Sequence, residues 1–495
     1  MRGLLLTLLL PILLPLGLAP APADPGAPAM SPGFTNHGRF ITDADGRAFI
    51  VAGINMVDKR APYRADAVGF GDDDAAFLAA NGFNAVRLGV IWKAVEPQPG
   101  VYDDTYLAHI RDEIQTLSEH GIATLVDFHQ DLYNEVYQGE GAPDWAVLPG
   151  GPPNAPKAGF PANQFINPAT MHAYDNFWSN AKGPGGVGLA DRYAAAWAHA
   201  AQYLKGEPGV MGLDIYNEPW PGTLWATCIP IGCPALDARI QKVSQKVIDA
   251  VRQVDADVPI YYEPNSLFND GISTYVKPTG TNLGFSFHDY CLTSIIGSSA
   301  GKLGDLLCDA TDTLTWSNAE RQLTRTGATP LLTEFGATTL QQTLTGMVDR
   351  AATHRLGWMY WAYCGCDDPT TTGAGDEQAL VFDPAKPPTG DNVDQAKLTA
   401  LAVPHPSLVS GTPTAYAYNR SSHVFTATWT TEKAAGGGSF ATGAQTTIAA
   451  PAVAYPNGYT VQVRGGQVVS AADADTVVVE QSAGATSISV TVSPR

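Results

Sequence analysis

The segment Gly212-Leu-Asp-Ile-Tyr-Asn-Glu-Pro-Trp220 is the strongest indication of how this chain folds. It predicts a short apolar strand that delivers Glu218 at its end, because Pro219 has no backbone N–H and stops the ladder of a sheet. A second stretch, Thr329-Pro-Leu-Leu-Thr-Glu-Phe-Gly336, has the same pattern and ends in Glu334. Two glutamates, each at the C-terminal end of a buried strand, indicate a pair that faces one substrate bond.

Eight apolar strands alternate with helical segments from about residue 40 onward. The expected strands are Ala48–Met56, Ala85–Ile91, Ile122–His129, Val210–Asn217, Pro259–Glu263, Leu283–His288, Pro330–Glu334 and Trp358–Trp361. Such an alternation is typical of a parallel sheet covered by helices, so the sequence predicts an α/β protein with a (β/α)8 TIM barrel. A doubly wound open sheet is the alternative, but no glycine-rich phosphate loop follows the first strand.

The composition changes after Val403-Pro-His-Pro406, where helical periodicity stops and short β-prone runs separated by turn residues begin. This pattern predicts a small C-terminal antiparallel β-sandwich. We therefore expect a barrel over residues 38–402 and a sandwich over residues 405–495. The sandwich has no residue set that identifies a ligand, so covering the barrel surface and binding carbohydrate both remain open.

The N-terminus has the pattern of a secretory signal. Arg2 precedes an apolar run from Leu4 to Leu18, and Ala21-Pro-Ala23 offers a small-x-small cleavage site. We expect residues 1–23 to be removed and the protein to be secreted. A membrane anchor is the alternative, but the run is short and broken by prolines. The net charge of -19 argues against a nucleic-acid partner and against electrostatic adhesion to anionic lipid.

Six cysteines agree with an oxidising compartment. They form three sequence-local couples, and the simplest disulfide pairing is Cys228–Cys233, Cys291–Cys308 and Cys364–Cys366. The last couple closes a very tight loop, so this pairing is the least certain to form. A zinc site is the competing interpretation, but it lacks Cys-x-x-Cys spacing and histidines at ligand distance in the sequence. We expect no metal and no cofactor.

The connection after the third strand, Leu132 to Leu189, is unusually long and rich in glycine and proline. Its aromatic residues include Trp145, Phe160, Phe165, Phe177 and Trp178. A long loop over the open end of a barrel favours a binding wall. The alternative is a loop that packs on a small apolar cluster of its own.

Polar residues at the C-terminal ends of barrel strands are the active-site candidates. Each strand in turn contributes at least one: Lys59, Arg87, His129 with Asp131, Asn217 with Glu218, Glu263, His288 with Tyr290, Glu334 and Trp361. A single buried histidine or arginine is more often structural than catalytic. The convergence of all of them on one rim is hard to explain by structure alone.

Glycosidic bond cleavage is the chemistry that uses two carboxylates without a metal. We expect Glu218 to be the acid/base and Glu334 the nucleophile, with Arg87 favouring the anionic form of Glu334. Asn217 can bond the sugar 2-hydroxyl, and Trp361 can form the floor under the ring. Buried ion pairing is the structural alternative for the two glutamates.

Asn217-Glu218-Pro219 and Thr333-Glu334-Phe335-Gly336 resemble the acid/base and nucleophile motifs of the clan A, family five retaining glycoside hydrolases. The positions of Arg87, His129, His288 with Tyr290, and Trp361 resemble the supporting residues of that family. More narrowly, three segments resemble the endoglycoceramidases: Asn55-Met-Val-Asp-Lys-Arg-Ala-Pro62, Asp127-Phe-His-Gln-Asp-Leu-Tyr-Asn134 and Gly141-Ala-Pro-Asp-Trp145. The resemblance extends over nearly the whole mature chain.

The resemblance to endoglycoceramidases implies hydrolysis of the β-linkage between an oligosaccharide and ceramide in glycosphingolipids. It implies that Lys59, Asp131 and Trp178 contact the sugars and that Glu218 protonates the ceramide oxygen. It also implies an open apolar groove on the lipid side and transient contact with a membrane or micelle. A β-glucan or mannan endohydrolase of the same family is one alternative. A non-catalytic glycan- or lipid-binding protein is disfavoured because both glutamates are present.

Overall fold

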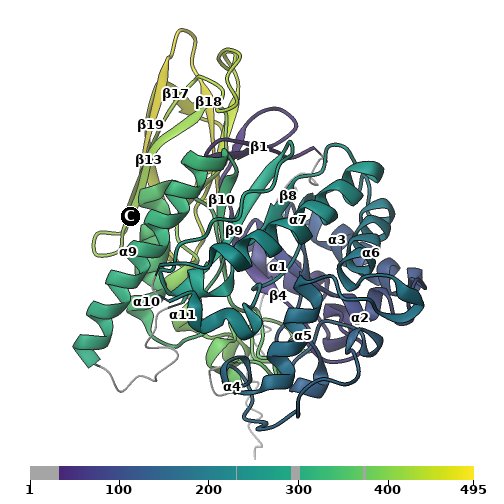
Figure 1. Cartoon of the computed structure of the whole chain (residues 1–495). Helices are drawn as coiled ribbons and strands as arrows, with labels where there is room; N and C mark the ends of the chain where they lie inside the picture. The colour runs from purple at the N-terminus through teal and green to yellow at the C-terminus, as the bar shows by residue number, and fades with distance from the viewer. Residues whose placement is uncertain (1–32, 230, 291–300, 372–374) are drawn as a thin grey trace, which may run out of the picture.

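The computed structural model describes residues 33–229, 231–290, 301–371 and 375–495, and in them a barrel and a two-sheet sandwich lie side by side (Figure 1). The predicted signal segment, residues 1–23, lies outside the described residues, as does Cys291. None of the described helices combines the length and the apolar character needed to cross a membrane.

Eight parallel strands close into the predicted barrel. In sheet order they are β10 Thr329–Phe335, β11 Trp358–Tyr360, β4 Ala52–Met56, β5 Ala85–Ile91, β6 Ala123–His129, β7 Val210–Asp214, β8 Ile260–Tyr262 and β9 Leu283–Asp289. Every residue of β5, β6 and β10 is buried, which is why these strands are continuous apolar runs rather than alternating ones. The prediction of a TIM barrel is confirmed.

The barrel interior is filled by side chains from alternate strands, and Tyr261 of β8 shows how tightly. A Cβ atom on Gly212 of β7 would lie 2.6 Å from the Tyr261 ring, and one on Gly284 of β9 would lie 2.2 Å from it. Both neighbouring strands therefore carry glycine at the level of this ring. Gly212 is therefore a glycine because no larger residue would leave room for the Tyr261 ring.

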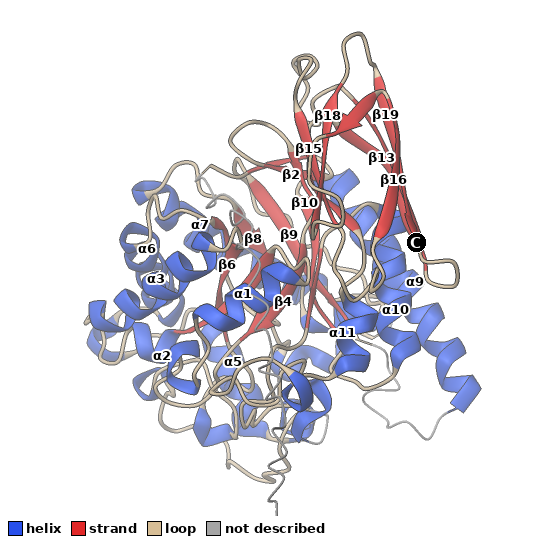
Figure 2. Ribbon diagram, turned by 180° about the vertical axis from the view of Figure 1, so that it is seen from behind, coloured by secondary structure: helices blue, strands red, loops and turns tan. Residues whose placement is uncertain are grey.

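Helices surround the barrel, as Figure 2 shows from behind. They are α1 Asp72–Ala80, α2 Trp92–Val95, α3 Asp104–Glu119, α4 Ala162–Ile166, α5 Pro168–Trp178, α6 Leu189–Tyr203, α7 Pro234–Val254, α9 Gly301–Thr326, α10 Gln341–His354 and α11 Gln395–Leu401. Two of them, α4 and α5, lie inside the connection that was expected to be a loop. The Asn167 side chain caps α5 by accepting from the backbone N–H groups of Ala169 and Thr170.

The sandwich has more strands than the sequence predicted, and some come from the N-terminus. One sheet is β1 Thr35–His37, β2 Phe40–Thr42, β3 Ala48–Phe49, β12 His405–Val409, β15 Gln445–Ala449, β18 Thr476–Gln481 and β17 Gly466–Val468. The other is β13 Thr412–Asn419, β14 Val424–Thr430, β19 Ser487–Pro494 and β16 Tyr459–Arg464.

The first predicted strand, Ala48–Met56, was therefore wrong in extent. Its first two residues pair with β2 and β12 in the sandwich, and the barrel strand begins only at Ala52. Phe40 and Ile50 pack in the sandwich core. The expected start of the barrel at residue 38 places these N-terminal strands in the wrong unit, because β3 joins them to the sandwich by pairing with β12, more than 350 residues away in the chain.

The disulfides join Cys228 to Cys233 and Cys364 to Cys366, as the sequence predicted. Cys308 is also disulfide-bonded, while its predicted partner lies outside the described residues. None of the cysteines that the structure describes is free, which agrees with a disulfide framework rather than a zinc site.

Candidate active site

The C-terminal ends of the barrel strands surround a cavity that is also lined by α4. Figure 1 shows α4 on the end of the molecule away from the sandwich. The polar lining of the cavity comes from the strand ends and the loops that follow them. With Gln164 of α4, the residues of this polar lining are Lys59, His129, Asp131, Asn217, Glu218, Ser266, Asn269, Asp270, Tyr290, Glu334, Trp361, Thr370 and Thr371. The structure thus brings together most of the residues that the strand-end argument selected.

The two glutamates of the opening argument face each other across this cavity. A carboxylate oxygen of Glu218 and one of Glu334 lie within 4.8 Å of each other and of a ring nitrogen of His288. Retaining glycosidases separate their carboxyl groups by about 5–5.5 Å, and inverting ones leave more room for water. Glu218 holds a left-handed φ of 43°, an unfavourable conformation that favours a functional role for its position.

Glu334 is fixed by two donors. Arg87 Nη1 donates to Oε1 at 2.5 Å, and the hydroxyl of Tyr290 donates to Oε2 at 2.8 Å. The carboxylate is 4% exposed and lies at the end of β10, so its oxygens can turn very little. Such a fixed carboxylate is suited to attack in one direction.

Glu218 has a different environment. His288 Nδ1 lies 2.9 Å from Oε1, and Asn269 Nδ2 donates to the same oxygen at 2.7 Å. Burial raises the pKa of Glu218 and outweighs the opposing hydrogen bond from His288, while the nearby charge of Glu334 adds to the rise. A carboxyl group with a raised pKa keeps its proton longer and is suited to be an acid.

Arg87 is the centre of the carboxylate network and has no exposed surface. Its Nε bonds Asp214 at 3.0 Å, and its Nη2 lies 3.0 Å from Asn217 Oδ1 and 3.1 Å from both Asp127 and Glu263. Burial alone lowers the pKa of Arg87, but the surrounding carboxylates, Asp127 first, raise it well above its ordinary value. The guanidinium is therefore a permanent cation that orients every carboxylate around it.

Two histidines add positive charge beside the glutamates. Burial lowers the pKa of His129, but Asp127 at 2.7 Å outweighs it and the pKa rises to about 10. Burial likewise lowers the pKa of His288, but the carboxylates of Glu263 and Glu334 raise it well above its usual range. The carboxylates around both rings therefore favour the imidazolium form of each.

Lys59 and Asp131 form the polar half of the cavity. Lys59 Nζ lies 2.7 Å from Asp131 Oδ2, 3.2 Å from Asp368 Oδ2 and 2.8 Å from Thr370 Oγ1. The ammonium also lies 4.5 Å from the centre of the Trp361 ring. The sequence argument missed Asp368 and Thr370, although both follow the eighth strand closely enough to have been found there.

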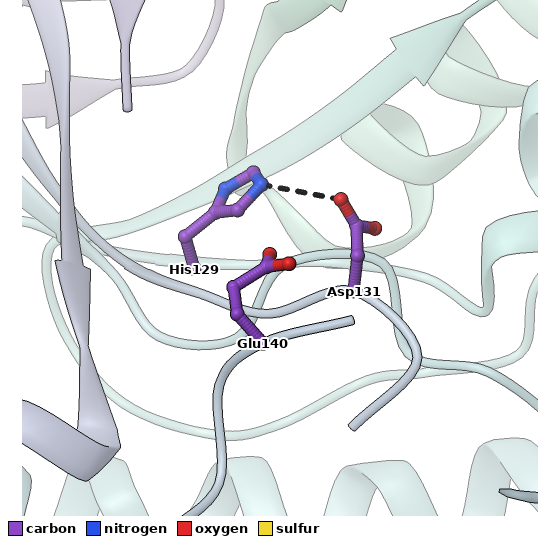
Figure 3. A group of neighbouring side chains, drawn as sticks. All are labelled: His129, Asp131 and Glu140. Atoms are coloured by element: carbon purple, nitrogen blue, oxygen red, sulfur yellow. Dashed lines mark ion pairs between the residues drawn. The ribbon is translucent and has the colours of Figure 1, made fainter. Parts of the chain in front are cut away.

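Glu140 is a further buried carboxyl group that the sequence argument did not select. Figure 3 shows it beside His129 and Asp131, and ligand atoms of the three lie within 4.8 Å of one another. Its oxygens have no hydrogen-bond partner among the described residues, and burial raises its pKa well above the ordinary value. Lys59, whose Nζ lies 2.7 Å from Asp131, is the cation that pairs with this cluster.

Apolar side chains gather in the part of the cavity next to Glu218, where the polar Gln164 also lies, and we call this part the apolar chamber. Phe160, Pro161, Phe165, Trp220 and Leu267 form it, and the rings of Phe165 and Trp220 lie 4.8 Å apart. Leu267 belongs to η6, Ser266–Asp270, the same turn whose Asn269 bonds Glu218. The carboxyl pair thus stands at the boundary between a polar and an apolar chamber.

Trp178 does not line the cavity, so its predicted contact with sugar is wrong. It is 5% exposed, its Nε1 donates to the carbonyl oxygen of Trp220 at 2.8 Å, and its ring packs on Phe177 and Tyr216. The amphipathic helix α5 turns this face toward the barrel. Both alternatives for the long connection hold, each for a different part of it. Phe160 and Phe165 form a wall of the cavity, and Phe177 and Trp178 belong to a packed cluster behind that wall.

Comparison with known proteins identifies this arrangement. Residues 42–367 match the model described as cellulase (glycosyl hydrolase family 5), and residues 404–492 match the glycoside hydrolase family 5 C-terminal domain. The chain belongs to glycoside hydrolase family 5. This family 5 glycoside hydrolase carries both domains of that match, in the order in which the structure shows them.

The family 5 glycoside hydrolase is similar to several endoglycoceramidases. Endoglycoceramidase I of Rhodococcus hoagii (strain 103S) is 32% identical over 454 residues, which cover 89% of this chain and 84% of that protein. Endo-glycoceramidase II from Rhodococcus sp., solved as a lactosyl-enzyme intermediate, aligns with a TM-score of 0.74 at 27% identity, covering 92% of this chain and 100% of that one. The same enzyme in its ganglioside GM3 complex aligns with a TM-score of 0.74 at 26% identity, covering 92% and 99%.

Proposed function

We propose that this chain is a retaining endoglycosidase that hydrolyses the β-glycosidic bond between the oligosaccharide and the ceramide of glycosphingolipids. The observation that carries the proposal is the two-sided cavity, in which a carboxyl pair with retaining spacing separates a polar chamber from an apolar one. The similarity to endoglycoceramidases supports the same substrate class.

The polar chamber suits the sugars. Lys59, Asp131 and Trp361 offer a cation, a carboxylate and an aromatic face within a few ångströms, which is the set that binds ring hydroxyls and the apolar face of a pyranose. Asn217 is oriented by Arg87 and by the carbonyl of Gln130, to which its amide donates at 3.1 Å. The amide nitrogen also lies 3.5 Å from Nε2 of His129, at the cavity wall, where it can reach a sugar 2-hydroxyl.

The apolar chamber suits the lipid. It lies on the side of Glu218, the carboxyl group that must protonate the leaving oxygen, so the leaving group enters among Phe160, Phe165, Trp220 and Leu267. An amphiphile with a glycan head and a hydrocarbon tail places its scissile bond at such a boundary. A polysaccharide would instead place a sugar against these aromatic and aliphatic side chains.

We propose one role for each glutamate, and the geometry of the site supports this assignment. A Glu334 oxygen attacks the anomeric carbon, the bond to the ceramide oxygen breaks, and Glu218 gives its proton to that oxygen to release ceramide. Water then enters, Glu218 takes a proton from it, and the resulting attack breaks the glycosyl–Glu334 bond with net retention of configuration. Tyr290 and Arg87 hold the nucleophile, and His288 and Asn269 hold the acid/base.

The location of the enzyme is part of the proposal. The pattern over residues 1–23 supports export, and an exported enzyme meets glycosphingolipids at a membrane or micelle surface. We therefore propose that it acts outside the cell, with transient contact with that surface.

The substrate class is tested by a digestion panel. We expect release of intact oligosaccharide from a ganglioside and from other glycosphingolipids, with retained anomeric configuration by NMR, and little release of sugar from soluble β-glucan or mannan. The reverse preference would assign the chain to polysaccharide hydrolysis. Binding without turnover of either class would point to a non-catalytic protein.

The role of Glu218 is tested by Glu218→Gln. The amide cannot give a proton, so we expect hydrolysis of the natural substrate to fall by about 10²–10⁴-fold. An aryl glycoside with a good leaving group needs no such proton and should lose much less in its first step. The wild-type rate should also fall as pH rises through the raised pKa of Glu218, and the variant should lack this alkaline limb.

Glu432→Gln is the matched control, because Glu432 is an exposed residue of the sandwich. It should leave both the rate and the pH profile unchanged. Equal losses for good and poor leaving groups in Glu218→Gln would refute the assignment of Glu218 as the acid.

A further inference from the structure

Two long segments beside the apolar chamber lack charge. Residues 158–174 and 219–236 contain no Asp, Glu, Lys or Arg, although 16% of the whole chain is charged. The first contains α4 and most of α5, and the second contains η5, Gly222–Thr227, and the loop closed by the Cys228–Cys233 disulfide. Uncharged surface of this length is unusual on a protein with a net charge of -19.

Large apolar side chains on these segments are exposed to solvent. Ile166 at the end of α4 is 49% exposed, and Ile229 and Ile231 on the disulfide loop are 52% and 76% exposed. Tyr275, 47% exposed, stands beside them, because its hydroxyl donates to the carbonyl oxygen of Ile231 at 3.4 Å. We call Ile166, Ile229, Ile231 and Tyr275 the apolar rim.

The apolar rim is connected to the apolar chamber through neighbouring residues. Phe165 lines the cavity and precedes Ile166, which points outward. The Phe165 ring lies 5.2 Å from the ring of Trp225, which leads along the chain to Cys228 and the disulfide loop. Phe165 and Trp225 thus connect the cavity lining with the segment that carries the exposed isoleucines.

The disulfide loop is held in place although its tip is exposed. Both cysteines are buried, and Cys233 directly precedes Pro234, the first residue of α7. The first turn of α7 also anchors the neighbouring segment, because Asp237 Oδ2 accepts from the backbone N–H of Tyr275 at 2.6 Å. The loop is therefore anchored at both ends, and this anchoring lowers the entropy cost when its isoleucines bind a partner.

We propose that the apolar rim is a membrane-docking surface, which inserts into the outer layer of the lipid bilayer that contains the substrate and brings the apolar chamber to it. This inference rests on the proposed function. A bilayer fits because the rim is apolar and uncharged, while the acidic charge of the whole chain opposes attraction to anionic lipid. Once the rim is inserted, the ceramide tails have a shorter distance to move from the lipid layer to the apolar chamber.

The test uses the full chain with Ile229→Ser and Ile231→Ser combined. We expect binding to phosphatidylcholine vesicles, measured by flotation, to fall about tenfold to a hundredfold, since two exposed isoleucines no longer enter the lipid. Hydrolysis of ganglioside in the same vesicles should fall in parallel, whereas turnover of a water-soluble aryl β-lactoside should stay within about twofold. Wild-type binding should change little with added salt.

Val468→Ser combined with Val469→Ser is the matched control, because these residues are 38% and 44% exposed on the sandwich at the other end of the molecule (Figure 1). It should leave vesicle binding unchanged. Unchanged binding of the isoleucine variant, an equal loss on the soluble substrate, or a wild-type dimer that the variant converts to monomer would each overturn the proposal. Binding to vesicles without ganglioside hydrolysis would instead refute the proposed substrate and leave the docking surface standing.

Discussion

Replacing Glu334 by alanine is expected to abolish turnover of glycosphingolipid, with a loss on the order of 10⁴-fold or more, because the covalent step has no nucleophile. Its neighbours keep other contacts that preserve the cavity: Arg87 on β5 still pairs with Asp127 and Asp214. The Tyr290 ring still packs edge-on against His288. We expect the variant to remain folded and to bind the glycan, which calorimetry with the free oligosaccharide can measure.

Small anions separate loss of the nucleophile from general damage. The space left by Glu334→Ala is open to the cavity, so azide or formate can attack the anomeric carbon of an activated aryl glycoside from that face. We expect partial recovery of the rate with added azide and a glycosyl azide of inverted configuration. Glu334→Gln is the matched control, since its amide fills the space and should not be rescued. Wild-type product of inverted configuration, or substantial residual activity in the alanine variant, would contradict the assignment.

Replacing Arg87 by alanine is expected to destabilise the barrel by about 3–5 kcal/mol, because it leaves a group of buried carboxylates without their central cation. The carboxylates that lose it are Asp127, Asp214, Glu263 and Glu334. Thermal unfolding of the wild type and the variant measures the difference, and loss of soluble protein is the extreme form of the same result.

The destabilisation should depend on pH with a definite sign. Without Arg87 the buried carboxylates retain protons to higher pH in the folded state than in the unfolded state, so the variant loses stability as pH rises through that interval. The gap between wild type and variant should therefore be larger at pH 7 than at pH 5. Arg47→Ala is the control: Arg47 pairs with Asp43 and Asp45 at the surface and should cost about 0–1 kcal/mol. A similar effect of the two substitutions would contradict the central role of Arg87.

Much of the site could be predicted from the sequence because, in a barrel, the residues that follow successive strands come together at one end of the fold. Each parallel strand ends at the same rim, so residues such as Glu218 and Glu334, identified only by their place after an apolar run, must converge. Asp127 and Asp214 are charged residues inside apolar strands, which also indicates a functional site, and both are partners of Arg87.

The sandwich and the long connection were harder to predict from the sequence, because the residues that contact each other there lie far apart in the chain. Strands β1 to β3 pair locally with one another, but β3 joins the sandwich by pairing with β12 near the other end of the chain, and no local pattern specifies that choice. In the long connection, Phe165 lines the cavity while Trp178 packs behind it. Both have the same aromatic character in sequence, and only the packing of α4 and α5 against the barrel decides which one faces the substrate.

The barrel, the pair of glutamates and the disulfides between close cysteines could be predicted from the sequence, because periodic burial and strand ends are patterns of consecutive residues. The tertiary structure alone decided the buried position of Glu140, the division of the cavity into two chambers and the exposure of Ile229 and Ile231 beside one of them. These features depend on which distant surfaces meet, and the free energy of such contacts has no counterpart in the order of neighbouring residues.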